Sequence, residues 1–95
     1  MPIALVMNFK GATSAQYDAL NVEMGFEPGG PGASGELFHW VAATDDGLLV
    51  TNVWDSEASS AKFLEERLVP AALKIGFTAE PDITVHPIHC YLTQR

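Results

Sequence analysis

The sequence is poor in cations and in cysteine, and each shortage excludes a class of function. Five Lys and Arg stand against 12 Asp and Glu, and the formal net charge is −7. Because few cations are present to neutralise phosphates, we expect no nucleic-acid partner and no binding to an anionic membrane surface. The one cysteine permits no internal disulfide, which suits a reducing compartment. We therefore expect a cytoplasmic protein.

Long apolar runs are also missing. None approaches the roughly 20 residues that a bilayer span needs, and Met1–Asn8 lacks the basic region and cleavage site of a signal peptide. Hydrophobic residues nevertheless make up 47% of the chain. The composition therefore predicts one domain, residues 1–95, with apolar surface that a second subunit could bury.

Turn and capping signals predict the element order β-α-β-β-α-β. Thr13 and Gln16 have capping-box spacing, and Asp45-Asp46-Gly47 is a strong hairpin signal. Pro70 interrupts the second helix and can start a short segment at Ala71–Ile75. We expect strands at Ile3–Phe9, Leu37–Thr44, Leu48–Asp55 and Ile83–Leu92, and helices from Thr13 to Gly25 and from Ser56 to Gly76. With right-handed crossovers, this order gives a ferredoxin-like α+β fold, a four-stranded antiparallel sheet with both helices on one face.

The expected strand Leu37–Thr44 is apolar on both sides. One side carries Phe38, Trp40 and Ala42, and the other carries Leu37, Val41 and Ala43. Two helices cover only one face of the sheet, and a strand that is apolar on both sides favours cover on both. We therefore expect a homodimer in which a second sheet covers the open face.

The segment 27–36 holds four glycines and two prolines and is expected to be a loop. Its glycines do not follow the spacing of a phosphate-binding loop, and it contains no lysine. A plain connector is the simplest interpretation, and a cover over a pocket is the alternative.

Three motifs carry a resemblance to a known family. They are Val53-Trp54-Asp55-Ser56-Glu57-Ala58 followed by Phe63, then Phe38-His39-Trp40, and finally His89-Cys90-Tyr91-Leu92. With these motifs, and in element order and size over its full length, the chain resembles the dimeric α+β barrel superfamily. That superfamily includes antibiotic-biosynthesis monooxygenases, haem-degrading monooxygenases and small polyketide cyclases. The resemblance implies two sheets packed face to face and a pocket in each subunit.

The haem-degrading branch uses an Asn, a Trp and a His, and only two of the three have a match. Asn8 and Trp54 stand at matching positions, but the histidine position falls at Leu64. The resemblance therefore does not imply haem degradation, and we expect no cofactor. Met1-Pro2-Ile3 also resembles the start of tautomerases, although the element order does not match theirs.

The three histidines are the candidate proton-transfer groups. His39 lies within one expected strand, and His86 and His89 lie on the last. Since His86 and His89 differ in strand parity, they point to opposite faces unless a bulge at Pro87 intervenes. Without a nearby carboxylate pattern they predict no metal site. Each histidine is either the catalytic base or a hydrogen-bonded residue at a rim or interface.

Amide and aromatic side chains complete the predicted site. Asn8 and Asn52 stand inside apolar strands, so each is paired to backbone or faces a pocket, where it could orient a carbonyl or enolate. Trp40, Trp54 and Phe38 can wall a pocket for a flat ligand, or belong to the core. Tyr17 and Tyr91 are possible hydroxyl donors.

These residues lead to three hypotheses. The first is a cofactor-independent monooxygenase of an aromatic or polyketide-like molecule, with His39, His86 or His89 as the base and Asn8 as a further catalytic residue. The substrate would contact Trp40, Trp54, Asn52, Phe38 and Tyr91. The second is a polyketide cyclase or isomerase on the same scaffold. The third is a non-catalytic homodimer that either binds a small apolar ligand or has a structural role.

Overall fold

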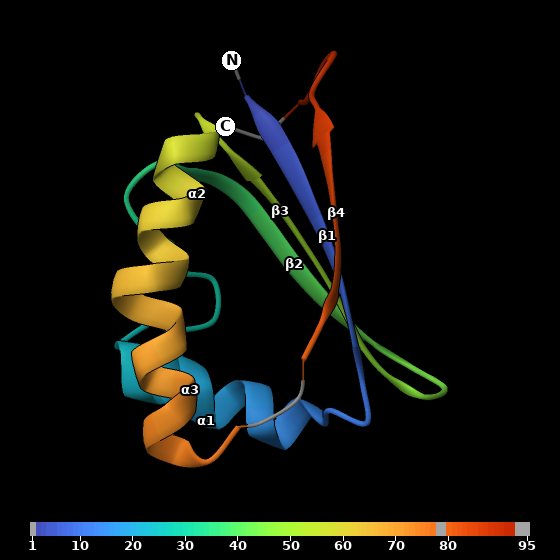
Figure 1. Cartoon of the computed structure of the whole chain (residues 1–95), viewed down its shortest axis with the longest axis vertical. Helices are drawn as coiled ribbons and strands as arrows, with labels where there is room; N and C mark the ends of the chain where they lie inside the picture. Colours follow the sequence, from blue (N-terminus) through green and yellow to red (C-terminus); the bar gives the residue numbers. More distant parts are fainter. Residues whose placement is uncertain (1, 78–79, 93–95) are drawn as a thin grey trace.

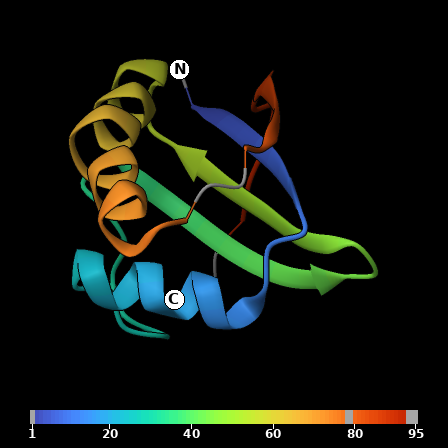
Figure 2. The same cartoon turned by 60° about the horizontal axis from the view of Figure 1, so that its bottom comes forward.

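Helices cover one face of a four-stranded antiparallel sheet (Figures 1 and 2). The computed structural model describes residues 2–77 and 80–92. The strands are β1 (Ile3–Lys10), β2 (Glu36–Thr44), β3 (Gly47–Trp54) and β4 (Asp82–Pro87), in the spatial order β2-β3-β1-β4. The predicted ferredoxin-like α+β fold is confirmed, with β2 and β4 at opposite edges. Met1, part of the tautomerase-like start, lies outside the described residues.

Helix α1 (Ser14–Met24) begins and ends at the predicted caps. The backbone N–H of Gln16 donates to the Thr13 hydroxyl at 3.2 Å, and the backbone N–H of Thr13 donates to Gln16 Oε1 at 2.9 Å. Gly25 ends the helix at φ 81°, a conformation that glycine adopts without strain. These caps fix the phase of α1, with Leu20 buried and Tyr17 half-buried.

The second helical column contains α2 (Glu57–Phe63), the π-helical segment η1 (Leu64–Leu68) and α3 (Val69–Ile75). The predicted short helical segment that Pro70 starts is confirmed, because Pro70 lies in the first turn of α3. The predicted interruption before it is a widened turn, in which the Val69 N–H donates to the Leu64 carbonyl. The π turn accommodates Pro70, which has no backbone N–H and whose ring crowds the preceding turn. The column therefore runs on without a break (Figure 1). Within the described residues, each helix is too short or too polar to cross a bilayer.

The core lies between β1, β3 and the helices. Alternate residues of the two central strands are buried, among them Leu5, Met7, Val50 and Trp54. Burying a side chain of this kind contributes on the order of 1.5–3 kcal/mol each. Trp54 is the most deeply buried large side chain and packs on Phe63 of α2, with 5.3 Å between the ring centroids.

The other face of the sheet has no helix over it. Phe38 and Trp40 of β2 lie on this face, 50% and 43% exposed, and pair with Val53 and Thr51 of β3. The predicted alternation of β2 is therefore confirmed from Phe38 onward, while Leu37 lies at an irregularity in the strand. We call this surface the open face.

The expected last strand, Ile83–Leu92, is wrong at its C-terminal end. Strand β4 ends at Pro87, which pairs with Ile3, the first residue of β1. The Ile88 N–H then donates to the Pro2 carbonyl at 3.0 Å, and the chain leaves the sheet. Because the strand stops there, no bulge at Pro87 brings His86 and His89 to one side.

Candidate functional site

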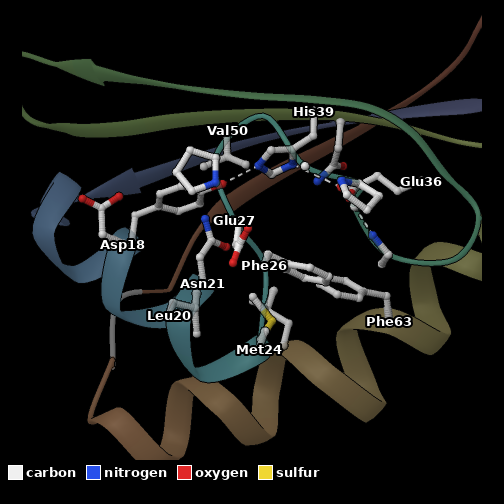
Figure 3. A pocket seen from close by; sticks show the side chains of 18 of the residues that line it. Asp18, Leu20, Asn21, Met24, Phe26, Glu27, Glu36, His39, Val50 and Phe63 are labelled. Atoms are coloured by element: carbon white, nitrogen blue, oxygen red, sulfur yellow. Dashed lines mark hydrogen bonds and ion pairs between the residues drawn. The ribbon is translucent and has the colours of Figure 1, made fainter.

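A cavity of about 700 Å³ lies between the sheet, α1 and the glycine-rich loop (Figure 3). This size falls in the range of small-molecule sites, which are concave, mostly apolar and supplied with a few polar groups. The apolar walls include Met7, Leu20, Phe26, Leu48, Val50 and Phe63. The polar lining includes Tyr17, Asn21, Glu36, His39 and Asn52.

A chain of hydrogen bonds joins Tyr17, His39 and Glu36. The Tyr17 hydroxyl lies 2.6 Å from His39 Nε2, and His39 Nδ1 lies 3.1 Å from Glu36 Oε2 (Figure 3). Because an ionised carboxylate only accepts, Nδ1 carries the imidazole proton and Nε2 is left to accept from the Tyr17 hydroxyl. This arrangement of base and orienting carboxylate is the one that general-base catalysis requires.

A bulge in β2 brings Glu36 to the side of His39. Residues three apart in a regular strand point to opposite faces, and a pairing of Glu36 with His39 is then impossible. Here Glu36 pairs with Trp54 and Phe38 pairs with Val53, so Leu37 is an extra residue. The irregularity places Glu36 on the side of the sheet that His39 occupies. A bulge was considered for Pro87 in β4, and the one observed between Glu36 and Phe38 lies at the opposite edge of the sheet.

The loop after α1 holds the Glu36 carboxylate in place. Glu36 Oε1 accepts from the Ala33 N–H at 3.2 Å, and the Glu36 side chain is only 7% exposed. A Cβ at Gly32 would collide with the same carboxylate oxygen, so a larger residue there would require the Glu36 carboxylate to move. The segment 27–33 also lines the cavity. It is therefore a wall of the cavity as well as a connector.

The pKa of Tyr17 is raised above its ordinary value of 10.0, chiefly because burial disfavours the phenolate. The charges of Glu36 and Asp18 raise this pKa further, while a side-chain hydrogen bond with Asn21 lowers it. Tyr17 therefore stays protonated at neutral pH, and its hydroxyl donates a hydrogen bond to His39.

We expect Tyr17→Phe to remove the tyrosine that ionises above the ordinary pKa. A raised folded pKa stabilises the fold below pH 10.0, the ordinary value, and that contribution is lost as the pH rises through the folded pKa. An ultraviolet titration of tyrosinate should lose its high-pH component in Tyr17→Phe and keep it in Tyr91→Phe. If Tyr91→Phe instead removes that component, the assignment to Tyr17 is wrong.

Asn52 is held by a hydrogen bond that fixes the orientation of its amide. The Trp54 indole N–H donates to Asn52 Oδ1 at 2.9 Å, and Asn52 is 4% exposed. With its oxygen engaged, the amide presents its NH₂ donors to the cavity that Asn52 lines. An amide held in this way can act as a hydrogen-bond donor to a negatively charged oxygen.

The structure gathers only part of the predicted site. His39 and Asn52 pair across β2 and β3 and both line the cavity, and Phe38 borders it. The remaining predicted residues, Trp40, Trp54, Asn8, His86, His89 and Tyr91, are not among its lining.

Each of these other residues has a definite place. Trp40 and His86 lie on the open face, where His86 Nε2 is 3.2 Å from the Thr84 hydroxyl. Asn8 also faces that side, and its buried Oδ1 has no hydrogen-bond partner among the described residues. His89 and Tyr91 follow the end of β4 and are exposed. Within residues 2–77 and 80–92, no group of three His, Cys, Asp or Glu could hold a metal ion.

Sequence reasoning missed Glu36 and gave Tyr17 only a minor place. The spacing of Glu36 and His39 argues against contact in a regular strand, and nothing in the sequence marks the bulge at Leu37. Tyr17 was recognisable as a residue on the inner face of α1, but its contact with His39, 22 residues away, depends on helix packing.

Solved structures of similar fold come from bacteria and cover almost the whole chain. SnoaB, a cofactor-independent oxygenase from Streptomyces nogalater, is 15% identical, with a TM-score of 0.64 and 98% of each chain covered. A candidate antibiotic biosynthesis monooxygenase from Chloroflexus aurantiacus is 24% identical, with a TM-score of 0.61 and coverage of 96% of this chain and 97% of that one. Another from Deinococcus radiodurans is 19% identical, with a TM-score of 0.60 and coverage of 100% and 99%. No protein-family model matches the chain, and no curated protein matches it in sequence.

The likeness establishes a shared fold. The neighbours are monooxygenase-like proteins and include an oxygenase that works without a cofactor. Sequence identities of 24% and below leave the chemistry of this chain to its own residues.

Proposed function

We propose that the protein is a cofactor-independent oxygenase of a small, flat aromatic or polyketide-like molecule, with His39 as the base. The observation that carries this proposal is the hydrogen-bonded chain Tyr17–His39–Glu36 at the wall of an apolar cavity. The Glu36 carboxylate orients the His39 imidazole, and apolar walls beside it can bind a flat ring. This combination suits removal of a proton from a weakly acidic substrate.

The first step moves a proton through Tyr17. The bound ketone, with its activated CH₂ group, reacts as its enol tautomer, whose O–H donates its proton to the Tyr17 oxygen as the phenol passes its own proton to His39 Nε2. The imidazolium formed lies 3.1 Å from the Glu36 carboxylate, which stabilises it. The NH₂ group of Asn52 donates to the substrate enolate. Since the Tyr17 pKa is raised, the tyrosine carries the proton onward without remaining ionised.

The second step uses dioxygen as the oxidant. The enolate carbon bonds to one oxygen atom, and the imidazolium of His39 returns its proton to give a hydroperoxide. Loss of water from the hydroperoxide leaves a ketone. The balance is one CH₂ group and one O₂ converted to one C=O group and one water, so no residue of the protein is oxidised or reduced.

The likeness to a cofactor-independent oxygenase supports the reaction class. Among the predicted residues, His39 and Asn52 line the same cavity, and this supports their assignment over His86, His89 and Asn8. Trp54 donates a hydrogen bond to Asn52 and so holds its amide, and the apolar side chain of Phe38 lines the cavity.

Oxygen uptake tests the proposal. We expect the protein to accelerate O₂ consumption by a dihydroxyanthrone, a tricyclic ketone with an activated CH₂ group, with one O₂ consumed per ketone formed. Conversion without O₂ uptake would favour the cyclase or isomerase hypothesis, because the same proton relay serves those reactions. Binding without any conversion would favour the non-catalytic binding protein.

We further propose that the protein is a homodimer joined through the open face. Phe38 and Trp40 are exposed there, and Val53 of β3 and Ala4 of β1 continue the row of side chains that begins at Phe38. Large exposed aromatic side chains on an uncovered sheet face are typical of an interface. Trp40→Glu should shift the sedimentation coefficient from dimer to monomer. Val22→Glu places the same charge on the exposed side of α1 and should leave the dimer intact. A wild-type protein that sediments as a monomer at micromolar concentration would contradict the dimer.

Composition supports the remaining partner and location proposals. The net charge of −7 favours a small apolar ligand over nucleic acid or an anionic membrane. Cys90 is free and exposed, which supports a reducing, cytoplasmic location for the proposed enzyme.

A further inference from the structure

The cavity carries negative charge and, among the described residues that line it, no positive charge. Asp18 of α1, Glu27 of the loop and Glu36 of β2 all contribute to its lining, while no Lys or Arg does (Figure 3). Glu36 is almost buried at the wall, whereas Asp18 and Glu27 are exposed. Any anion that enters therefore meets like charge at three places.

Two cationic side chains of the second helical column, Arg67 and Lys74, are engaged elsewhere. The Arg67 guanidinium donates to the Met24 carbonyl at 2.6 Å and lies over the Phe26 ring, 5.2 Å from its centroid. Lys74 is paired with Glu23 at 3.1 Å. Neither Arg67 nor Lys74 lines the cavity. A carboxylate ligand would therefore lose its hydration without gaining an ion pair.

His39 does not supply the missing cation. If it takes up a proton, the imidazolium lies 3.1 Å from the Glu36 carboxylate, so the pair is already neutral as a whole. The groups left for a ligand are the Tyr17 oxygen, which accepts from a hydroxyl, and the Asn52 amide, which donates to a carbonyl. Both requirements are met by an uncharged hydroxy-ketone.

We infer that this cavity selects uncharged, hydroxylated aromatic ketones and rejects the same ring system when it bears a carboxylate. The inference rests on the proposed function, because it names the substrate class of that site. The inference also goes beyond that function. A cavity with apolar walls and no charged lining would bind the ring system with or without a carboxylate, provided that the carboxylate pointed into solvent.

Matched ligands test the inference by binding alone. The probes are a dihydroxyanthraquinone carboxylic acid and its primary amide, compared by isothermal titration calorimetry at one pH above the pKa of the ligand carboxyl. We expect the amide to bind at least about tenfold more tightly, a difference of about 1.4 kcal/mol. Higher salt should reduce this ratio, because the charges of Asp18 and Glu27 are exposed to solvent.

Charge-neutralising variants show which residues cause the difference in affinity between the amide and the carboxylate. The double variant Asp18→Asn, Glu27→Gln should bind the carboxylate more tightly and leave the amide affinity close to wild type. Asp45→Asn removes one negative charge in the β2–β3 hairpin turn, which projects from one end of the sheet (Figures 1 and 2). Asp45 does not line the cavity, so this variant should leave the ratio unchanged. Asparagine is well tolerated in such a turn, so the control should fold.

Equal affinity for the two ligands, or tighter binding of the carboxylate, would overturn the inference. If the dihydroxyanthrone is still oxidised in that case, the proposed function stands and only the charge selection fails. If neither ligand binds and no oxygen is consumed, the inference and the proposed function fail together.

Discussion

Replacing His39 with alanine should lower turnover of the dihydroxyanthrone by about 10²–10⁴-fold, the range typical for loss of a general base. In the proposed relay His39 Nε2 is the final proton acceptor, and the hydrogen bond from Nδ1 to Glu36 orients the imidazole. Without the imidazole, the Tyr17 hydroxyl has no base to receive its proton, and its raised pKa disfavours the phenolate as a substitute.

Glu36→Gln tests separately the two effects of Glu36 on His39, which are orientation of the imidazole and stabilisation of the imidazolium formed by proton transfer. The amide keeps the size of the side chain but removes the charge that stabilises the imidazolium. We therefore expect a fall in kcat smaller than that of His39→Ala, with little change in KM. Because Glu36 also accepts from the Ala33 N–H, circular dichroism must show that the variant is folded.

The other two histidines are the matched controls. His86 is exposed on the open face and His89 follows the end of β4, so His86→Ala and His89→Ala should keep the wild-type rate. A wild-type rate in His39→Ala, with the fold intact, would eliminate His39 as the base. Loss of activity in His86→Ala or His89→Ala alone would transfer the role to that residue.

Local signals were sufficient to predict the fold. The capping box at Thr13 and Gln16 and the hairpin turn at Asp45–Gly47 are formed by residues close in sequence. The structure has each of them at the predicted position. The parity of β2 correctly divided Trp40 from Val41. Long-range pairing decided what local signals could not, including the end of β4 at Pro87.

The candidate site was only partly predictable because two of its contacts depend on irregular or distant structure. The contact between Glu36 and His39 requires the extra residue Leu37 in β2, and the contact between Tyr17 and His39 requires α1 to pack beside that strand. Asn52 was more accessible to prediction, since a polar residue inside an apolar strand needs a partner. Its partner is Trp54 on the same strand, and its place at the cavity follows from the regular alternation of β3.

The second large effect is expected at that amide. Asn52→Ala should lower kcat by about 10²–10³-fold, the usual cost of removing one donor to a developing oxyanion. The donor is preset, because Trp54 holds the amide oxygen and directs the NH₂ group toward the cavity. The neutral bound substrate carries less charge on its oxygen than the enolate does, so KM should change less than kcat.

Trp54→Phe tests the preset orientation. Phenylalanine keeps most of the ring that packs on Phe63 but removes the N–H, so the Asn52 amide loses the bond that fixes its direction. We expect a smaller fall in kcat than for Asn52→Ala, and no further fall when the two substitutions are combined, because Trp54 acts through Asn52. Steady-state kinetics of the two single variants and the double variant measure this coupling.

Asn8→Ala is the matched control for the amide. Asn8 lies in β1 and faces the open side of the sheet, so its removal should leave kcat near the wild-type value. If Asn52→Ala retains full activity while Asn8→Ala loses it, the reacting molecule binds on the open face, and the cavity beside His39 is not the active site. If Trp54→Phe lowers activity equally with and without Asn52, the tryptophan contacts the substrate or the fold directly, and its role in orienting the amide is wrong.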